Sequence, residues 1–116
     1  MNDQEIEQVI QAKGLTAARV TPADIEAAIV GTDVVVFQAP SGQVLRWGVL
    51  TMRNGFAVTG HPSVAVSPEN DDVELGERIA IDNAKSALWP LLGYELKSKL
   101  AEAANLDAAY RACEGR

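Results

Sequence analysis

Residues 50–94 read LTMRNGFAVTGHPSVAVSPENDDVELGERIAIDNAKSALWPLLGY, and this stretch decides the fold. The Asn54-Gly55 pair predicts a turn between two antiparallel strands, because these residues take up the positive φ angles of a tight hairpin at little cost. Acidic residues and then apolar residues at helical spacing predict a long amphipathic helix from about Pro68. A hairpin covered by a helix is a two-layer arrangement that buries both apolar surfaces.

Strand signals continue upstream of this stretch. The run Val34-Val35-Val36-Phe37 is β-branched and aromatic, and its lack of alternation indicates burial on both faces or a central position. A turn at Pro40-Ser41-Gly42 leads into a second strand over residues 44–52, and residues 56–60 return as a third. The pattern predicts a three-stranded antiparallel meander, with a brief edge strand at 64–66.

Two short helices are expected before the strands. The first covers residues 3–13 and ends at Gly14. The second begins at Thr21-Pro22, where the threonine hydroxyl can accept the N–H of Asp24, and closes at Gly31. Both helices are short, and each offers a narrow apolar stripe.

The long helix is expected to pack on the sheet through a broad face and to end or kink at Trp89-Pro90. That face comprises Leu75, Gly76, Ile79, Ala80, Asn83, Ala84, Ala87 and Leu88. Beyond the proline a second helix resumes through Leu96 and Leu100. We therefore expect an α+β fold whose C-terminal part is a helical hairpin or a kinked long helix, with one domain over 1–100 and an alanine-rich helical extension over 101–116.

The net charge of −6 disfavours binding to nucleic acid, because an acidic surface repels phosphate backbones. A single cysteine, Cys113, makes a reducing compartment the default. No signal peptide and no apolar run long enough to span a bilayer are recognised, so we expect a cytosolic protein without a membrane partner.

No constellation of residues indicates catalysis or a metal site. His61 is the one histidine, and it reads as a solvated loop residue. The acidic cluster Glu69, Asp71, Asp72 and Glu74 could bind a hard cation, but it suits a solvated helix start better. We therefore predict no catalytic residues, no metal and no cofactor.

Four residues are candidates for ligand or partner contacts: Arg78, Asn83, Trp89 and Tyr94. Asn83 lies on the expected packing face, where a buried amide needs partners, so a structural hydrogen bond to the hairpin is the main alternative to a ligand contact. Trp89 and Tyr94 bracket the kink, and Trp47 lies on the middle strand. Such aromatic side chains are usually core residues, but an exposed one would anchor a partner or stack on a base.

Several motifs recur in one order in a known family. They are Lys13-Gly14-Leu15, Arg19-Val20-Thr21-Pro22, Leu50-Thr51-x-x-Asn54-Gly55-Phe56-x-Val58-Thr59-Gly60, Ser67-Pro68-Glu69-Asn70, Leu75-Gly76, Ile79-Ala80 and Trp89-Pro90-Leu91-x-Gly93-Tyr94-x-Leu96. Over residues 12–100 the chain resembles the small tailed-phage proteins named for gene product 49 of one enterobacterial phage and gene product 66 of another. Members often carry an aromatic residue after the Ser-Pro-Glu-Asn turn, where this chain has Asp71.

The resemblance implies a phage or prophage origin, an accessory role of unassigned function, and a location in the cytoplasm of the infected or lysogenic bacterial host. It supplies no catalytic residues. We expect a non-enzymatic protein that binds a host or phage protein during infection and associates with itself through its C-terminal helices. The alternatives are a sponge that sequesters a nucleotide-like signalling molecule in counter-defence, or a phage protein with no separable activity.

Overall fold

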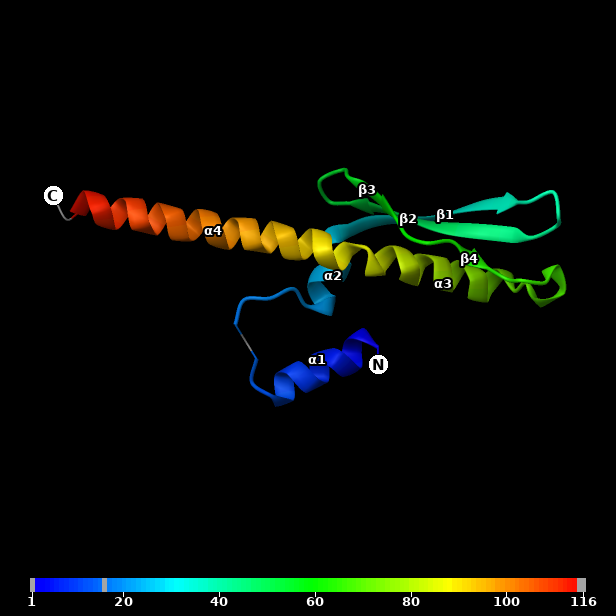
Figure 1. Cartoon of the computed structure of the whole chain (residues 1–116), viewed down its shortest axis with the longest axis horizontal. Coiled ribbons are helices and arrows are strands. Elements are labelled where there is room, and N and C mark those ends of the chain that lie inside the picture. Colours follow the sequence, from blue (N-terminus) through cyan, green and yellow to red (C-terminus); the bar gives the residue numbers. More distant parts are fainter. Residues whose placement is uncertain (1, 16, 115–116) are drawn as a thin grey trace. The chain divides into compact units, whose positions relative to one another are not determined.

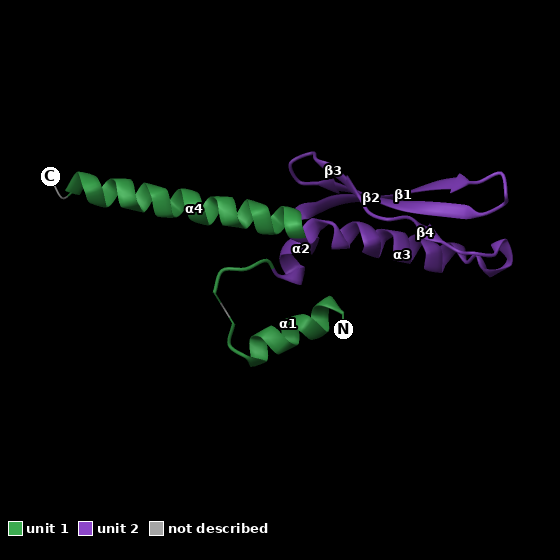
Figure 2. Ribbon diagram, in the orientation of Figure 1, with its two compact units in different colours: residues 1–20, 90–116 green, residues 21–89 purple. Residues whose placement is uncertain are grey.

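The computed structural model describes residues 2–15 and 17–114. The chain divides into two compact units, one formed by Thr21–Trp89 and the other by Met1–Val20 with Pro90–Arg116 (Figure 2). The first unit holds the whole sheet, and each unit is described by itself below.

The sheet is an antiparallel meander of β1 (Ile29–Gln38), β2 (Val44–Met52) and β3 (Ala57–Thr59), in that spatial order (Figure 1). A short strand, β4 (Ser63–Val64), pairs with the start of β2. Helix α3 (Val73–Ser86) packs on one face of this sheet. The predicted α+β class and meander are therefore confirmed.

The hairpin between β2 and β3 differs in detail from the predicted turn. The amide of Met52 donates to the carbonyl of Phe56 at 2.8 Å, so the loop contains residues 53, 54 and 55. Gly55 adopts φ +88°, whereas no described non-glycine residue has a positive φ. This is the three-residue hairpin in which a glycine in the left-handed region follows a turn, rather than a two-residue loop with two positive φ angles.

Helix α3 approaches the sheet so closely that backbone meets backbone. A Cβ atom placed on Gly48 would lie 2.5 Å from the carbonyl oxygen of Ala80, and one on Gly60 would lie 2.4 Å from that of Asn83. The helical side of this interface is also made of small residues, since Gly76, Ala80 and Ala84 are buried. The two glycines therefore allow a helix–sheet distance that any larger residue would increase.

This close approach corrects the predicted packing face of α3. Leu75 and Ile79 were expected against the sheet, but they are 55% and 42% exposed, while Ala80, Ala84 and Leu88 are fully buried. Large side chains cannot enter an interface in which the two backbones nearly touch, because overpacking would force them apart. Leu75 and Ile79 lie at its margin instead.

Helix α2 (Pro22–Ala28) begins as predicted and ends earlier than predicted. The Thr21 hydroxyl accepts the amide of Asp24 at 3.2 Å, and the Asp24 carboxylate accepts the Thr21 amide at 2.8 Å. The helix ends at Ala28, because Ile29 is already extended and starts β1. Gly31 is therefore a strand residue next to a register irregularity and not the predicted helix terminator.

Strand β1 is an edge strand, contrary to the predicted central position. Within the described ranges it pairs only with β2. Val35, Val36 and Phe37 are each more than half exposed. Burial within this unit therefore does not explain the apolar run at residues 34–37. Its side chains point alternately to the two faces of the sheet, on a strand that lies at the edge.

The second unit contains helix α1 (Asp3–Ala12) and most of helix α4 (Leu88–Glu114). Asn2 and Glu5 form a capping box at the start of α1. Helix α3 ends at Ser86, and Pro90 lies in the first turn of α4, where its missing N–H needs no partner. The predicted interruption near Trp89-Pro90 is thus confirmed. From Leu88 α4 runs to Glu114 as one helix, so of the two predicted alternatives, a helical hairpin and a kinked long helix, the chain forms the kinked long helix.

We expect Gly48→Ala to lower the free energy of unfolding by about 2–3 kcal/mol, because the added methyl group overpacks the α3–sheet interface. Urea denaturation followed by circular dichroism measures the change. Gly93→Ala is the matched control, since nothing lies within 4 Å of a Cβ built there. An alanine in that helix should leave the midpoint unchanged or raise it. Equal effects of the two substitutions would refute this account of Gly48.

Candidate functional site

The two faces of β2 differ in what covers them. Arg46, Gly48, Leu50 and Met52 alternate along the strand and are buried on the side of α3. The intervening residues Leu45, Trp47 and Val49 point to the opposite side and are half-buried.

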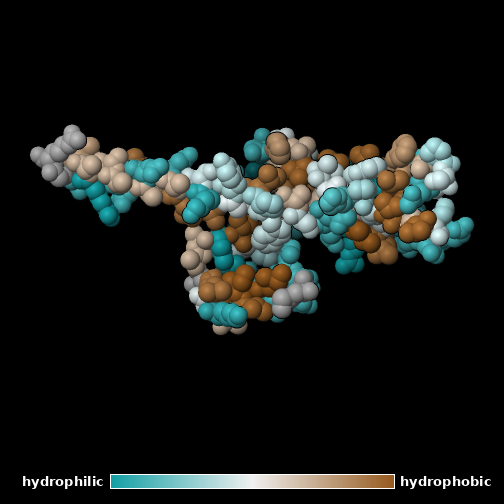
Figure 3. Space-filling view, viewed as in Figure 1, coloured by the Kyte–Doolittle hydropathy of each residue, from teal (hydrophilic) through white to brown (hydrophobic). Residues whose placement is uncertain are grey.

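Side chains of β1 extend this second surface. Val35 pairs with Trp47 and Phe37 pairs with Leu45 across the antiparallel register, so each pair shares a face. Val35 is 53% exposed and Phe37 is 54% exposed. We call the surface formed by Val35, Phe37, Leu45, Trp47 and Val49 the outer face. Hydrophobic atoms reach the molecular surface over this part of the sheet in Figure 3.

On the side of the sheet that α3 covers, an ion pair links strand β2 to the segment that leads into α3. The Nη1 and Nη2 atoms of Arg46 donate to the two carboxylate oxygens of Asp71 at 2.6 and 2.8 Å. Arg46 is 5% exposed and Asp71 is 17% exposed, so the pair lies mostly out of water. Two parallel hydrogen bonds of this kind fix orientation as well as distance.

Each partner shifts the other's titration. The hydrogen bonds from Arg46 lower the pKa of Asp71, and the same hydrogen bonds raise the pKa of Arg46 against the effect of burial. The Nε atom of Arg46 has no hydrogen-bond partner in the part of the chain that the structure describes. Gly76 leaves room for this guanidinium, because a Cβ there would lie 2.7 Å from Nη1.

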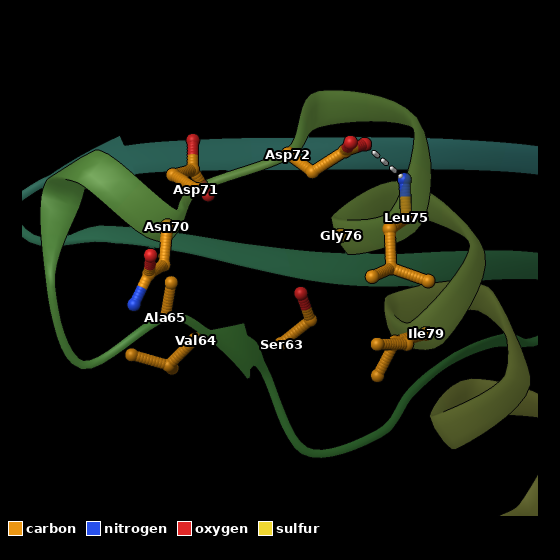
Figure 4. Close-up of a pocket in the computed structure, with 9 residues that line it drawn as sticks. All are labelled: Ser63, Val64, Ala65, Asn70, Asp71, Asp72, Leu75, Gly76 and Ile79. Carbon is orange, nitrogen blue, oxygen red and sulfur yellow. Dashed lines mark hydrogen bonds between the residues drawn. The ribbon is translucent and has the colours of Figure 1, made fainter.

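A small open pocket of about 160 Å³ lies beside this ion pair (Figure 4). Its lining residues come from the β4 region, the loop before α3 and the first turns of α3: Ser63, Val64, Ala65, Asn70, Asp71, Asp72, Leu75, Gly76 and Ile79. Asp72 caps α3 by accepting the amide of Leu75 at 2.9 Å. Two members of the predicted acidic cluster therefore have structural partners, since Asp71 binds Arg46 and Asp72 caps the helix.

The four candidate contact residues are divided between the two units, with Arg78, Asn83 and Trp89 in one and Tyr94 in the other. Arg78 is exposed on α3, and Asn83 follows it by five residues, which places the two about 140° apart around the helix. The side-chain amide of Asn83 donates to the carbonyl oxygen of His61 at 3.1 Å, which ties α3 to the loop after β3. Trp89 is half-buried in the same unit. Tyr94 belongs to α4 in the other unit and is 78% exposed.

Sequence reasoning missed two features of strand β2, one on each face. Arg46 has the same alternation as buried Leu50 and Met52, and a charged residue at that parity signals a buried partner. Sequence reasoning places Trp47 on the middle strand as an anchor if exposed, but does not give its neighbours. Its place beside Val35 and Phe37 follows from the register.

Within residues 2–15 and 17–114, no group of three or more histidine, cysteine, aspartate or glutamate side chains is arranged to hold a metal ion. None of the described helices combines the length and the apolar character required to cross a bilayer.

The chain belongs to the phage protein (N4 Gp49/phage Sf6 gene 66) family, whose model matches residues 20–100. The match begins a few residues later than the resemblance noted over 12–100 and confirms it. No curated protein and no solved structure matches the chain. The family description names a phage origin and no activity.

We expect Asp71→Asn to destabilise the protein much more than Asp72→Asn at neutral pH. The first substitution leaves the buried Arg46 without a counter-charge, whereas asparagine at position 72 still caps α3. Urea midpoints of the two variants measure the difference.

This effect should depend on pH. Because the folded-state pKa of Asp71 is lowered, its contribution to stability is present above about pH 4, the usual range for an aspartate, and is lost as the pH falls through the folded-state value. The stability gap between the wild type and Asp71→Asn should therefore shrink on acidification. A gap that is constant down to pH 2 would contradict the role of the ionised carboxylate.

Proposed function

We propose that this phage family member is an accessory protein that acts by binding another protein, of the phage or of its host, through the outer face. The observation that supports this proposal is the exposure of apolar side chains on the face of the sheet that α3 does not cover. Contiguous apolar surface of this kind on a small domain is typical of a protein interaction site.

The outer face is made of apolar and aromatic side chains, so its composition suits an apolar patch on a protein better than a polar ligand. It combines one tryptophan and one phenylalanine with three aliphatic residues, and Trp47 lies on the middle strand among them. Tryptophan is enriched among the few residues that dominate binding energy, most often near the centre of an interface. The net charge of −6 favours a partner whose own surface is neutral or basic around an apolar patch.

Replacing Trp47 tests this proposal. We expect Trp47→Ser to weaken the partner complex roughly 30-fold, because a central aromatic anchor contributes about 2 kcal/mol or more. The tagged chain is used to capture proteins from infected and uninfected host cells, and the captured protein is then purified for titration calorimetry. Val73→Ser is the control, since Val73 is 58% exposed at the start of α3 and lies outside the outer face.

Circular dichroism and a urea midpoint establish that the Trp47 variant is folded. Unchanged affinity of a folded Trp47→Ser variant would refute binding through the outer face. Failure to recover a protein from either lysate would count against a protein partner altogether.

A second candidate is the sequestration of a nucleotide-like signalling molecule. Two of the residues predicted to contact a ligand present free groups to solvent. Arg78 makes no hydrogen bond or ion pair with the described residues, and the ring of Tyr94 is 78% exposed. A guanidinium group binds phosphate and an aromatic ring stacks on a base.

Thermal shift distinguishes this candidate. A nucleotide at a hundredfold its dissociation constant adds about 2.7 kcal/mol to the free energy of unfolding, so cyclic and linear nucleotides should raise the melting temperature if one of them binds. Arg78→Gln should then remove the shift. Lys97→Gln is a control that changes the charge by the same amount at another exposed site. An unchanged melting temperature with every nucleotide would refute nucleotide binding.

A further inference from the structure

We propose that the open edge of β1 pairs with β1 of a second copy of this chain, antiparallel and about a twofold axis at Val35, to form one continuous sheet. This inference goes beyond the proposed function, because it uses the backbone edge of β1, whereas partner binding uses side chains across the outer face.

The two edges of the sheet differ in how they are protected. On one side β2 is followed by β3 and β4, which contain three and two residues, and short edge strands offer little for another chain to pair with. On the other side β1 has ten residues, with its irregularity confined to Ile29 and Gly31. Residues 32–38 contain neither proline nor lysine, which are the usual residues that block an edge.

The backbone groups at this open edge can be identified from the register. The amide of Ala39 donates to the carbonyl of Gln43 at 2.7 Å, so Ala39 directs its hydrogen-bonding groups towards β2. Such residues alternate with residues that point away. Phe37, Val35 and Asp33 therefore also point towards β2. Thr32, Val34, Val36 and Gln38 direct their N–H and C=O groups to the open edge.

The four outward-pointing residues are placed symmetrically about Val35. Because of this symmetry, a second copy of the same strand can pair with the open edge. An axis at Val35 pairs Thr32 with Gln38 of the partner and Val34 with Val36, so all four outward residues find a match. Shifting the axis to Val36 would place Thr32 opposite Pro40, which has no N–H to donate. The edge is thus self-complementary about Val35, where all four outward residues pair among themselves, as an isologous interface requires.

Charge agrees with the same register. Asp33 is the only charged residue between 29 and 38, and an axis at Val35 places it opposite Phe37 rather than opposite itself. Like charges directly opposite each other would be destabilising in a chain that is already strongly acidic. The two Val35 side chains meet in a non-hydrogen-bonded pair, in which side chains approach most closely.

The size of the contact sets the expected strength. Seven paired residues span about 24 Å of strand, which is a small interface compared with the ~1,200 Å² or more of stable complexes. We therefore expect a dimer with a dissociation constant in the micromolar range. Pairing would join the outer faces of the two copies into one surface.

Introducing a charge at Val35 tests the position of the twofold axis. Sedimentation velocity of the full chain at increasing concentration should show a monomer–dimer equilibrium. Val35→Lys and Val35→Glu should each weaken it by roughly tenfold or more, because identical charges meet at the axis. An equimolar mixture of the two variants should restore the dimer. Phe37→Lys is the matched control, since lysine at position 37 would face Asp33 of the second copy and should preserve the association.

Cross-linking provides a second measurement. In a Cys113→Ser background, Val35→Cys should form a disulfide-linked dimer on mild oxidation, because Cα atoms in such a pair lie about 4.5 Å apart. Val34→Cys is the control, since its counterpart would lie about 8 Å away in this register. A wild-type chain that is monomeric throughout, or a Lys/Glu mixture that does not dimerise, would overturn the proposal.

One further variant separates β1 from the C-terminal helix. Leu106 and Tyr110 are 73% and 64% exposed on α4, so this helix is an alternative place for self-association. The double substitution Leu106→Glu and Tyr110→Glu should leave the β1 dimer intact. Loss of the dimer in that variant, with the dimer retained in Val35→Lys, would place the association on α4 and refute pairing through β1.

Discussion

The close approach of α3 to the sheet is the constraint on which the rest of this unit depends. Gly48 and Gly60 let the backbone of the helix lie directly against the strands, and Ala80 and Ala84 keep the helical side equally thin. The interface therefore gains its stability from dense contact over small residues rather than from large interlocking side chains. Several larger apolar side chains of α3 and β1 lie outside this interface and are exposed.

The thin interface also explains why a charged pair lies at its end. Arg46 belongs to the buried face of β2, and Gly76 is the helical residue that leaves space for its guanidinium. A buried cation is costly unless a carboxylate compensates it, and Asp71 does so from the segment that leads into α3. The pair thus holds the beginning of the helix to the strand at one end of the interface, while Asn83 holds it to the loop after β3 further along.

Because one helix covers the sheet, its two faces differ in burial, and its two edges also differ in strand length. One face is buried under α3, while the other presents Trp47, Val35 and Phe37. One edge is closed by short strands, while the other exposes a long strand rich in valine. The uncovered face and the open edge are the surfaces on which interaction with other molecules is proposed, and they do not require an assembled set of catalytic groups.

The sequence by itself determined the elements of this fold, because their signals are local. Thr21 with Pro22, Asn54 with Gly55, and Pro90 mark a helix start, a hairpin and a helix interruption through backbone preferences that act within a few residues. The family motifs were likewise readable along residues 20–100. Only the tertiary structure decided that β1 lies at an edge, that Leu75 and Ile79 remain exposed, and that Arg46 meets Asp71. Those outcomes depend on how near two backbones come and on which strand lies last in the sheet, and neither quantity is encoded in the spacing of residues along the chain.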